Sequence, residues 1–121
     1  MTIQEYQKLI GEKSKGRKYG NIPTELDGIR FDSKAEARRY AELKMYQTGG
    51  VISNLQRQVR FQLTVNNVKC GVYIADFCYT DTAGSFVVED VKGGKATQTP
   101  LYRLKKKLMF AIYGYEIKEV Q

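Results

Sequence analysis

The chain has 121 residues, of which 42% are hydrophobic and 27% are charged. This composition is typical of one globular domain and excludes a disordered protein. There is no histidine, and the two cysteines form no Cys-x-x-Cys motif, which excludes Ser-His-Asp and Cys-His nucleophile systems and the usual zinc sites. Any enzymatic activity must therefore use carboxylates, Lys, Tyr or a hard metal ion.

The charge is strongly positive, because 20 Lys and Arg residues stand against 13 Asp and Glu residues and give a net charge of +7. Such an excess is typical of polyanion binding, although a solvated basic surface would give the same value. No stretch reaches the roughly 18 apolar residues of a membrane-spanning helix, and the first residues lack the apolar core of an export signal. We therefore expect a cytoplasmic protein that does not enter a membrane.

The N-terminal residues predict a short helix and a linker. Thr2 and Glu5 have the spacing of a capping box, and an apolar stripe with helical period predicts a helix over residues 2–10. Residues 11–21, GEKSKGRKYGN, are basic and rich in glycine, which is typical of a mobile linker. We expect residues 1–22 to form this extension and residues 23–121 to form the folded domain.

The domain begins with a hairpin and a helix. Asp27-Gly28 is a turn signal within TELDGIRF and predicts a small hairpin. Ser33 and Glu36 form a second capping box, and Gly49-Gly50 is typical of a helix end. We therefore expect a helix from Ser33 to about Gln47.

Three antiparallel strands are expected next. Residues 55–65 alternate apolar and polar side chains, which is typical of a strand covered on one face. Asn66-Asn67 predicts a tight turn into a strand over 68–79, and the polar interval 80–85 leads to a third strand over 86–92. Cys70 and Cys78 fall in the second strand, where we expect small buried apolar groups rather than a disulfide.

A second helix and a last strand complete the domain. Thr99-Pro100 supplies an N-cap and a first-turn proline for a helix over about 100–113, ended by Gly114. Residues 115–120 predict a strand, and a helix between the third and last strands places these two strands parallel. The sequence therefore predicts an α/β fold with a mixed sheet of about four strands flanked by helices. The expected buried stripe of the second helix is Leu101, Leu104, Leu108 and Ile112.

Two acids and a lysine are the best candidates for chemistry. Asp90 and Lys92 point to one face of their strand, because side chains alternate across a strand. If the 80–85 connection turns about residue 83, Asp76 lies directly opposite Asp90. Two facing carboxylates repel and destabilise a sheet unless a cation binds between them, and Mg²⁺ suits such hard oxygen ligands. Lys92 would then orient or deprotonate a water molecule, or neutralise developing charge. An inert pairing of Asp76 with a nearby lysine remains the alternative.

The pattern Ala75-Asp76, thirteen intervening residues, then Asp90-Val91-Lys92 resembles the signature of the PD-(D/E)xK nuclease superfamily. The signature usually has proline where this chain has Ala75. The acid before the lysine is either Glu89 or Asp90, and we choose Asp90 because only this residue shares a face with Lys92. The resemblance implies a restriction-endonuclease-like three-layer core, phosphodiester hydrolysis and dependence on Mg²⁺, with Mn²⁺ as a substitute.

The resemblance also implies a third metal-binding carboxylate, Glu36. The expected metal ligands are then Glu36, Asp76 and Asp90, and the expected catalytic residues are these three and Lys92. Its place in a capping box is a sufficient structural reason for a glutamate there. FDSKAEA, Gln58, IADF, EDVKG and KKKL together resemble a family of small phage and prophage proteins. The chain is also similar to the endonuclease subunits of heteromeric transposases and to Holliday junction resolvases.

Candidate substrate-binding residues are Gln58, Lys95, Arg103, Lys105 and Lys106. Lys105 and Lys106 are expected nearer the active face than Lys107, and a solvated basic face is the alternative. The resulting hypothesis is a phage-derived, structure-selective DNA endonuclease for recombination, junction resolution, replication or packaging, acting on branched or double-stranded DNA. A homodimer is compatible with the sequence. The alternatives are a non-catalytic nucleic-acid-binding module of the same fold and an RNA-directed nuclease.

Overall fold

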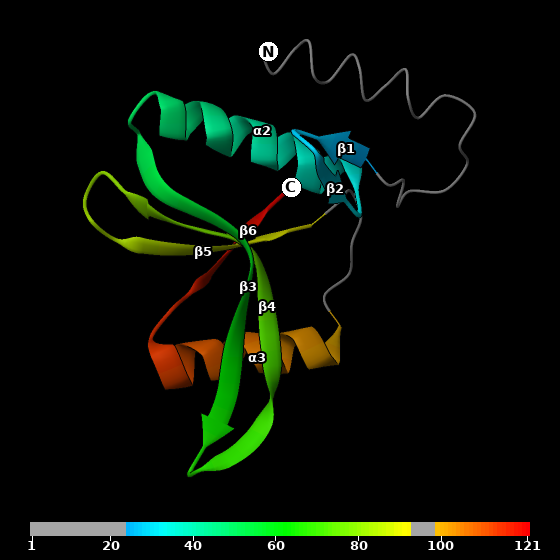
Figure 1. Ribbon diagram of the computed structural model, residues 1–121. Helices are drawn as coiled ribbons and strands as arrows, with labels where there is room; N and C mark the ends of the chain where they lie inside the picture. The colour runs from blue at the N-terminus through cyan, green and yellow to red at the C-terminus, as the bar shows by residue number, and fades with distance from the viewer. Residues whose placement is uncertain (1–23, 93–98) are drawn as a thin grey trace.

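The computed structural model describes residues 24–92 and 99–121, and the expected helix over 2–10, the linker and Lys95 lie outside this part of the chain. Its elements are β1 (Thr24–Leu26), β2 (Ile29–Phe31), α2 (Lys34–Thr48), β3 (Ile52–Val65), β4 (Val68–Asp81), β5 (Phe86–Val91), α3 (Pro100–Tyr113) and β6 (Ile117–Val120). Figure 1 shows α2 and α3 on opposite sides of the main sheet, so the molecule has three layers.

The main sheet has the order β3-β4-β5-β6, and β1 and β2 form a separate hairpin. β3, β4 and β5 pair antiparallel, whereas β5 and β6 pair parallel. The parallel pair follows from the connection between them, because α3 crosses over one face of the sheet before the chain returns. The predicted α/β fold with a mixed sheet of four strands is therefore confirmed.

Local signals define most element boundaries. The Ser33 side chain accepts a hydrogen bond from the Glu36 amide (3.2 Å) at the start of α2, and Thr99 does the same for the Tyr102 amide (3.1 Å) at the start of α3. Gly114 ends α3 with φ of 78°, a left-handed conformation that glycine adopts without a steric penalty. The largest boundary differences are at β3, which begins at residue 52 rather than 55, at β4, which ends at 81 rather than 79, and at β6, which begins at 117 rather than 115.

Two separate cores hold the layers together. The core between α2 and the sheet consists of Phe31, Ala37, Tyr40, Leu43, Ile52, Phe77 and Tyr79. The core between α3 and the sheet consists of Leu63, Tyr73, Ala75, Cys78, Val88, Met109 and Ile117. The two cores bury Phe77 and Cys78 of β4 and Val88 and Glu89 of β5, whereas most of the polar residues along β3 stay exposed.

The sheet faces change over within β4. Tyr73 and Ala75 belong to the core under α3, but Phe77, two residues further on, belongs to the core under α2. Regular alternation would keep these three side chains on one face. Across the ladder lies Gln58, whose φ is 53°, between the pairs Arg57–Phe77 and Val59–Ala75. Figure 1 shows both strands bending in their middle, and this bend places Asp76 where the two faces exchange.

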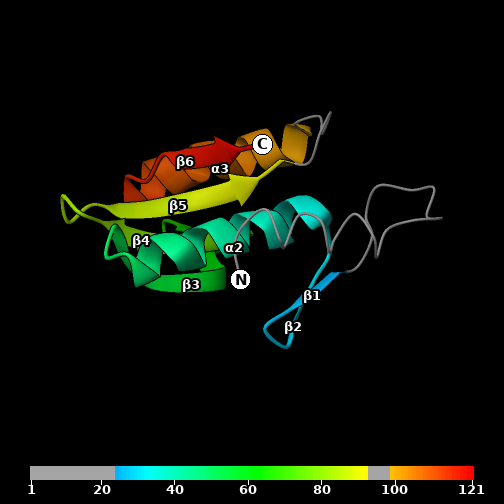
Figure 2. The same cartoon turned by 90° about the horizontal axis from the view of Figure 1, so that it is seen from above.

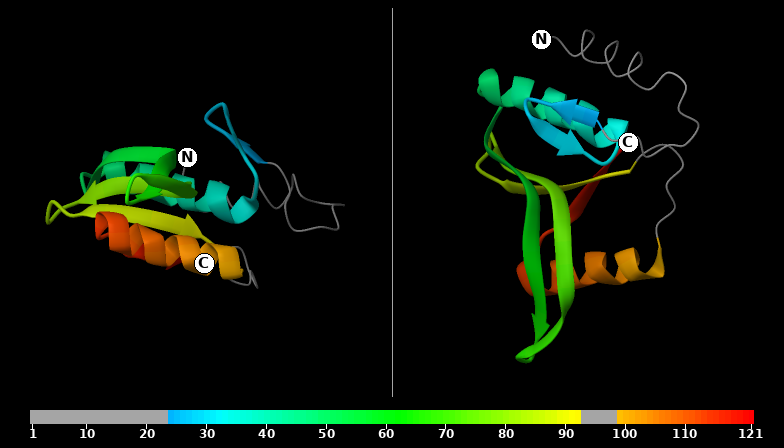
Figure 3. Two further views of the ribbon diagram at one scale, coloured as in Figure 1. Left: turned by 90° about the horizontal axis from the view of Figure 1, so that it is seen from below. Right: turned by 45° about the vertical axis from the view of Figure 1, so that its right-hand side comes forward.

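The structure corrects two predictions about burial. Leu101 and Leu104 are 61% and 54% exposed, whereas Met109 is fully buried with Tyr102, Leu108 and Ile112 packed around it. The helix therefore packs on the sheet through Met109 and its neighbours, and the side that carries Leu101 and Leu104 is exposed. Cys70 is exposed rather than buried, because the β3–β4 hairpin extends past α3 at its tip, as the right-hand view of Figure 3 shows. Cys78 is buried as expected, and both cysteines are free.

Candidate active site

The site lies at one end of the sheet, where three elements meet. Figures 1 and 2 both show the end of β5 at the same side as the first turns of α2 and α3. Glu36 comes from the first turn of α2, Tyr102 from the first turn of α3, and Asp90 and Lys92 from the end of β5. The fold thus gathers side chains from widely separated parts of the chain.

Asp76 and Asp90 face each other across β4 and β5. The ladder pairs Cys78 with Val88 and Phe77 with Glu89, a register symmetric about residue 83, as predicted. Asp76 and Asp90 are the residues that follow this ladder, and Asp90 is close enough to raise the pKa of Asp76. The Val91 amide donates a hydrogen bond to Asp76 Oδ2 at 2.7 Å and fixes the orientation of this carboxylate.

The electrostatic environment of Asp76 is unfavourable for a free carboxylate. Burial, together with the nearby Asp90 and Glu36 carboxylates, raises the pKa of Asp76 to about 7, even though the Val91 hydrogen bond acts in the opposite direction. A proton on Asp76, or a cation bound beside it, would reduce this electrostatic repulsion. Two like charges directly opposite each other destabilise a sheet. Packing alone therefore gives no reason for this pair of acids to be present.

Lys92 is held beside Asp90 by two contacts. Its Nζ lies 3.3 Å from Asp90 Oδ2, and both side chains are only 15% exposed. The same ammonium group lies 3.3 Å from the centroid of the Tyr102 ring, in a cation–π contact. The Tyr102 hydroxyl in turn donates to Glu119 Oε2 at 2.7 Å. Asp90 and Lys92 therefore share the α3 face of β5, as the alternation predicts.

Glu89, the other acid before the lysine, points to the opposite face. It is fully buried, and its two oxygens accept hydrogen bonds from Arg39 Nε (2.9 Å) and Nη2 (2.8 Å). The Tyr79 hydroxyl also donates to Glu89 Oε2. A carboxylate with these partners is satisfied and enclosed, so Glu89 serves to attach β5 to α2 and is not open to a ligand.

Glu36 is buried, and its role in the capping box uses only its backbone. The Glu36 amide donates to Ser33, while its carboxylate accepts a hydrogen bond from Gln58 Nε2 at 2.8 Å. Burial raises the pKa of Glu36, and Asp32 and Asp90 raise it further. Gln58 reaches Glu36 from the left-handed backbone position at the bend of β3, a conformation that costs about 1 kcal/mol or more for a non-glycine residue.

The carboxylates are suited to a metal as a pair rather than as a triad. Within residues 24–92 and 99–121, no three Asp, Glu or Cys side chains are gathered closely enough to hold one ion together. The set of three ligands expected from Glu36, Asp76 and Asp90 is therefore not assembled. Asp76 and Asp90 remain a pair of hard oxygen ligands with unbalanced charge, which fits Mg²⁺, because this ion keeps several waters and needs only one or two carboxylates.

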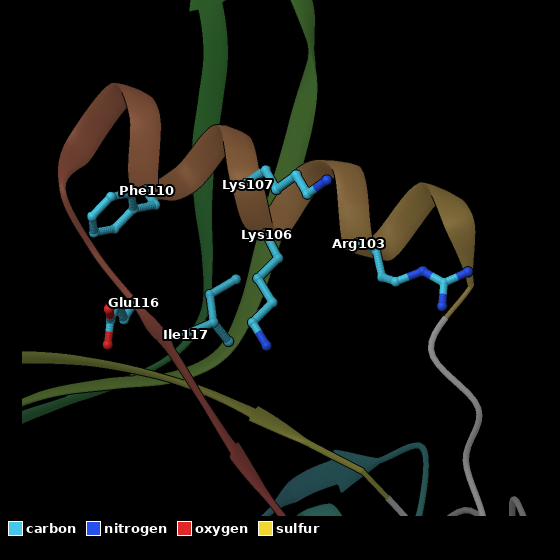
Figure 4. A pocket seen from close by; sticks show the side chains of 6 residues that line it. All are labelled: Arg103, Lys106, Lys107, Phe110, Glu116 and Ile117. Atoms are coloured by element: carbon cyan, nitrogen blue, oxygen red, sulfur yellow. The ribbon is translucent and has the colours of Figure 1, made fainter.

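The basic residues of α3 divide between two hollows. Lys105 lines a cavity of about 340 Å³ that includes Asp90. Arg103, Lys106 and Lys107 line a separate groove of about 650 Å³ with Phe110, Glu116 and Ile117, shown in Figure 4. Lys106 therefore lines the groove with Lys107 and not the cavity with Lys105, while its ion pair with Glu119 links it to Tyr102 beside Lys92. The reason is helical geometry, since residues 103, 106, 107 and 110 share one side of a helix and residue 105 does not.

The groove carries positive charge that is only partly balanced. Lys106 Nζ lies 3.4 Å from Glu119 Oε1, and hydrogen bonds from Tyr102 and then Lys106 lower the pKa of Glu119. Arg103 and Lys107 have no ion-pair partner among the described residues. Arg103 also stands near the start of the helix, where the helix dipole disfavours a cation. An anionic ligand would remove both penalties.

Sequence reasoning missed three residues near Asp90 and Lys92, namely Tyr73, Tyr102 and Glu119. It also missed Arg39 and Tyr79, which bind the structural acid Glu89. None of these belongs to a recognisable motif. Neither α2 nor α3, the two helices of the described residues, is long and apolar enough to span a membrane.

Comparison with known proteins assigns the chain to a family. The model of the family described as "Protein of unknown function (DUF1064)" matches residues 16–120, and the chain therefore belongs to this family. No curated protein and no solved structure matches the chain.

Proposed function

We propose that this DUF1064 protein is a Mg²⁺-dependent DNA endonuclease of the PD-(D/E)xK superfamily, with Asp76, Asp90 and Lys92 at its reaction centre. The observation that supports this most is the pair of facing carboxylates, of which Asp76 has a pKa of about 7. Lys92 is the one cation in contact with the pair, through Asp90, among the described residues. Two acids and one lysine leave a net negative charge at the end of a buried sheet, and a divalent cation would balance it.

The alternative of an inert pair of strand-end acids explains the geometry less well. A structural acid in this fold has the surroundings of Glu89, with a bidentate arginine and a hydroxyl donor. Asp76 instead has one amide donor and two acidic neighbours. Selection for stability alone would replace such an acid by a neutral residue, because an uncompensated buried charge is strongly unfavourable.

In the proposed reaction each residue has a defined task. Asp76 and Asp90 would hold Mg²⁺, which supplies a Lewis acid and lowers the pKa of a bound water molecule. The Val91 amide keeps the Asp76 carboxylate oriented, and Gln58 does the same for Glu36. Lys92, held by Asp90 and the Tyr102 ring, would donate to a phosphate oxygen and neutralise the charge that develops there. In the hydrolysis a water molecule would give up a proton to solvent as its oxygen bonds to phosphorus, the phosphorus–oxygen bond to the leaving group would break, and the leaving oxygen would take up a proton from solvent.

The basic groove on α3 supports DNA as the substrate. Arg103, Lys106 and Lys107 form a positive row along one side of the helix in Figure 4, and phosphate contacts of this kind give affinity without reading sequence. Structure-selective cleavage of branched or double-stranded DNA fits a small domain without a separate recognition module. Phage recombination, junction resolution, replication or packaging remain the proposed contexts. The groove would contact the phosphates of RNA as well as those of DNA, so RNA is the alternative substrate.

One observation favours a second candidate function, a non-catalytic nucleic-acid-binding module of the same fold. The absence of a three-carboxylate group in the described part of the chain would be expected of a protein that binds without cutting. Against this, two facing acids repel phosphate, and a binding module would gain affinity by losing them.

The decisive experiment is a cleavage assay on linear, branched and single-stranded DNA with Mg²⁺ and with EDTA. We expect Mg²⁺-dependent cleavage by the wild type, loss of cleavage in Asp90→Ala, and wild-type activity in the control Glu25→Ala, an exposed acid on β1. If the wild type cuts none of these substrates, the protein is not a DNA nuclease. If Asp90→Ala cuts as well as the wild type, the reaction centre lies elsewhere.

A further inference from the structure

A cavity of about 340 Å³ lies beside Asp90, between the middle of β4 and the first turns of α3. It is lined by residues 72–74, Asp90, Thr99, Leu101, Tyr102 and Lys105. Asp90 is thus both a member of the proposed reaction centre and part of the cavity wall. Whatever occupies the cavity lies next to the reacting groups.

The edge of β4 forms one wall of the cavity. Three consecutive residues of this strand line it, although their side chains alternate between faces, and this is expected when a strand edge borders the space. β4 pairs with β5 only over residues 77–80, so this edge of residues 72–74 has no strand partner within the described chain. On their other edge these residues pair with β3, so only the backbone groups that point away from β3 can bond a ligand.

Tyr73 supplies a second sign of a missing ligand. Its side chain is only 4% exposed, and its hydroxyl is buried without a hydrogen-bond partner in the described structure. Burial and then the neighbouring Asp90 carboxylate raise the pKa of this hydroxyl. Buried hydroxyl groups without a partner are rare in native proteins. A ligand acceptor at this position would satisfy the group.

The rim of the cavity is apolar with one cation. Leu101 and Ile74 are 61% and 44% exposed, and no element of the described structure covers them. Tyr102 adds an aromatic ring, and Lys105 adds a positive charge. This combination fits a flat, largely apolar group that is joined to a phosphate. The volume lies at the lower end of small-molecule sites, which run from roughly 300 to 1,000 Å³, so one nucleotide fits and a duplex does not.

We propose that this cavity receives one unstacked nucleotide of the DNA strand that is cut, with its base between Leu101, Ile74 and Tyr102 and a neighbouring phosphate at Lys105. This inference rests on the proposed nuclease function and names its substrate class. A base inside a regular duplex cannot enter the cavity, and extruding it carries a free-energy penalty that an already unpaired base avoids. The preferred substrate is therefore DNA with an unpaired nucleotide, as at a bulge, a branch point or a single-stranded end.

The test uses the full-length protein with Ca²⁺ in place of Mg²⁺ and two labelled duplexes. One duplex carries a single bulged 2-aminopurine, and the other carries the same base analogue fully paired. Leu101→Trp fills the mouth of the cavity, and Leu104→Trp is the matched control on the same helix, similarly exposed and outside the cavity lining. Tyr73→Phe removes only the unpartnered hydroxyl. Thermal unfolding establishes that each variant is folded.

We expect the wild type to prefer the bulged duplex and to change the fluorescence of its 2-aminopurine on binding. Leu101→Trp should weaken binding of the bulged duplex on the order of tenfold, in line with the loss of one stacked base, while Leu104→Trp should not. Tyr73→Phe should weaken the same binding with no loss of thermal stability. Equal affinity for both duplexes, equal effects of the two tryptophan variants, or no binding of either duplex would overturn the cavity assignment. The cleavage assay with Mg²⁺ tests the nuclease function separately.

Discussion

Glu89 and Asp90 are neighbours in the chain, yet the two sides of β5 give them opposite surroundings. Glu89 is fully buried under α2, with its charge balanced by Arg39 and a further hydrogen bond from Tyr79. Asp90, on the α3 side, pairs with Lys92, lies near the second acid Asp76 and borders an open cavity. The fully satisfied acid is therefore a structural link, whereas the acid with unbalanced charge beside a cavity is the candidate for chemistry.

We expect the largest effect on stability from removing the arginine that balances the buried acid Glu89. Arg39→Met would leave Glu89 buried without its cation, and we expect the free energy of unfolding to fall by about 3–5 kcal/mol. Urea denaturation measures this change. A loss below about 1 kcal/mol, the range of a surface ion pair, would show that Glu89 does not anchor β5 to α2.

Asp90→Asn tests the other side of the strand. We expect cleavage to fall about a thousandfold, equal to roughly 4 kcal/mol in the activation barrier, with unchanged or greater stability because a repelling charge is removed. The adjacent variant Glu89→Gln is the matched control, and we expect it to lose stability while its folded fraction still cleaves. If the two variants exchanged these effects, the two roles would be assigned to the wrong acids.

Asp76→Asn separates function from stability at the facing acid. The amide oxygen can still accept the hydrogen bond from Val91, and the repulsion with Asp90 disappears. We expect cleavage to be lost while the free energy of unfolding above pH 7, measured without divalent ions, rises by about 1–3 kcal/mol. A destabilised Asp76→Asn protein would contradict the strain attributed to this pair.

The pH dependence of the wild type follows from the same carboxylate. Its pKa is about 7 in the folded protein against an ordinary value of 3.8, so the folded state holds the proton more tightly than the unfolded state. The resulting stabilisation is fully present below pH 3.8 and is lost as the pH rises through about 7. This loss should be smaller in Asp76→Asn and in the presence of Mg²⁺, as thermal unfolding across this range would show.

Gln58→Gly tests whether the left-handed backbone of Gln58 in β3 serves the carboxylate site through Glu36. Glycine suits the φ of 53°, so stability should be unchanged or greater, but the hydrogen bond to Glu36 is lost. We expect cleavage to fall by about tenfold or more, as for other residues that orient an active-site group. Asn54→Gly is the control, since Asn54 has φ of 55° in the same strand. Equal cleavage by both variants would show that Gln58 does not belong to the active site.

We expect the smallest effect, on DNA affinity, from neutralising the basic residues of the α3 groove. The double variant Arg103→Gln with Lys107→Gln should lower DNA affinity about tenfold and reduce the salt dependence of binding by about two charges. Arg60→Gln with Lys69→Gln makes the same charge change on the exposed β3–β4 hairpin as a control. An unchanged salt dependence in the first variant would show that the groove does not contact phosphate.

Much of the local structure follows from short stretches of sequence. The caps at Ser33 and Thr99, the Asn66-Asn67 turn and the α3 crossover all depend on neighbouring residues or on general handedness. The placement of Asp90 with Lys92 and away from Glu89 also follows, because alternation in a strand is a local property. The facing position of Asp76 needed only a symmetric turn.

What the tertiary structure alone decided depends on residues far apart in the chain. Gln58 meets Glu36 across 22 positions, and Arg39 meets Glu89 across 50. The exposed leucines of α3, the separation of Lys105 from Lys106 and the cavity at Asp90 depend on how the helix is rotated on the sheet. In the observed rotation Met109 is buried in the core and Tyr102, Leu108 and Ile112 pack against it. Local periodicity carries no information about it, since leucine and methionine stripes satisfy a helix equally well.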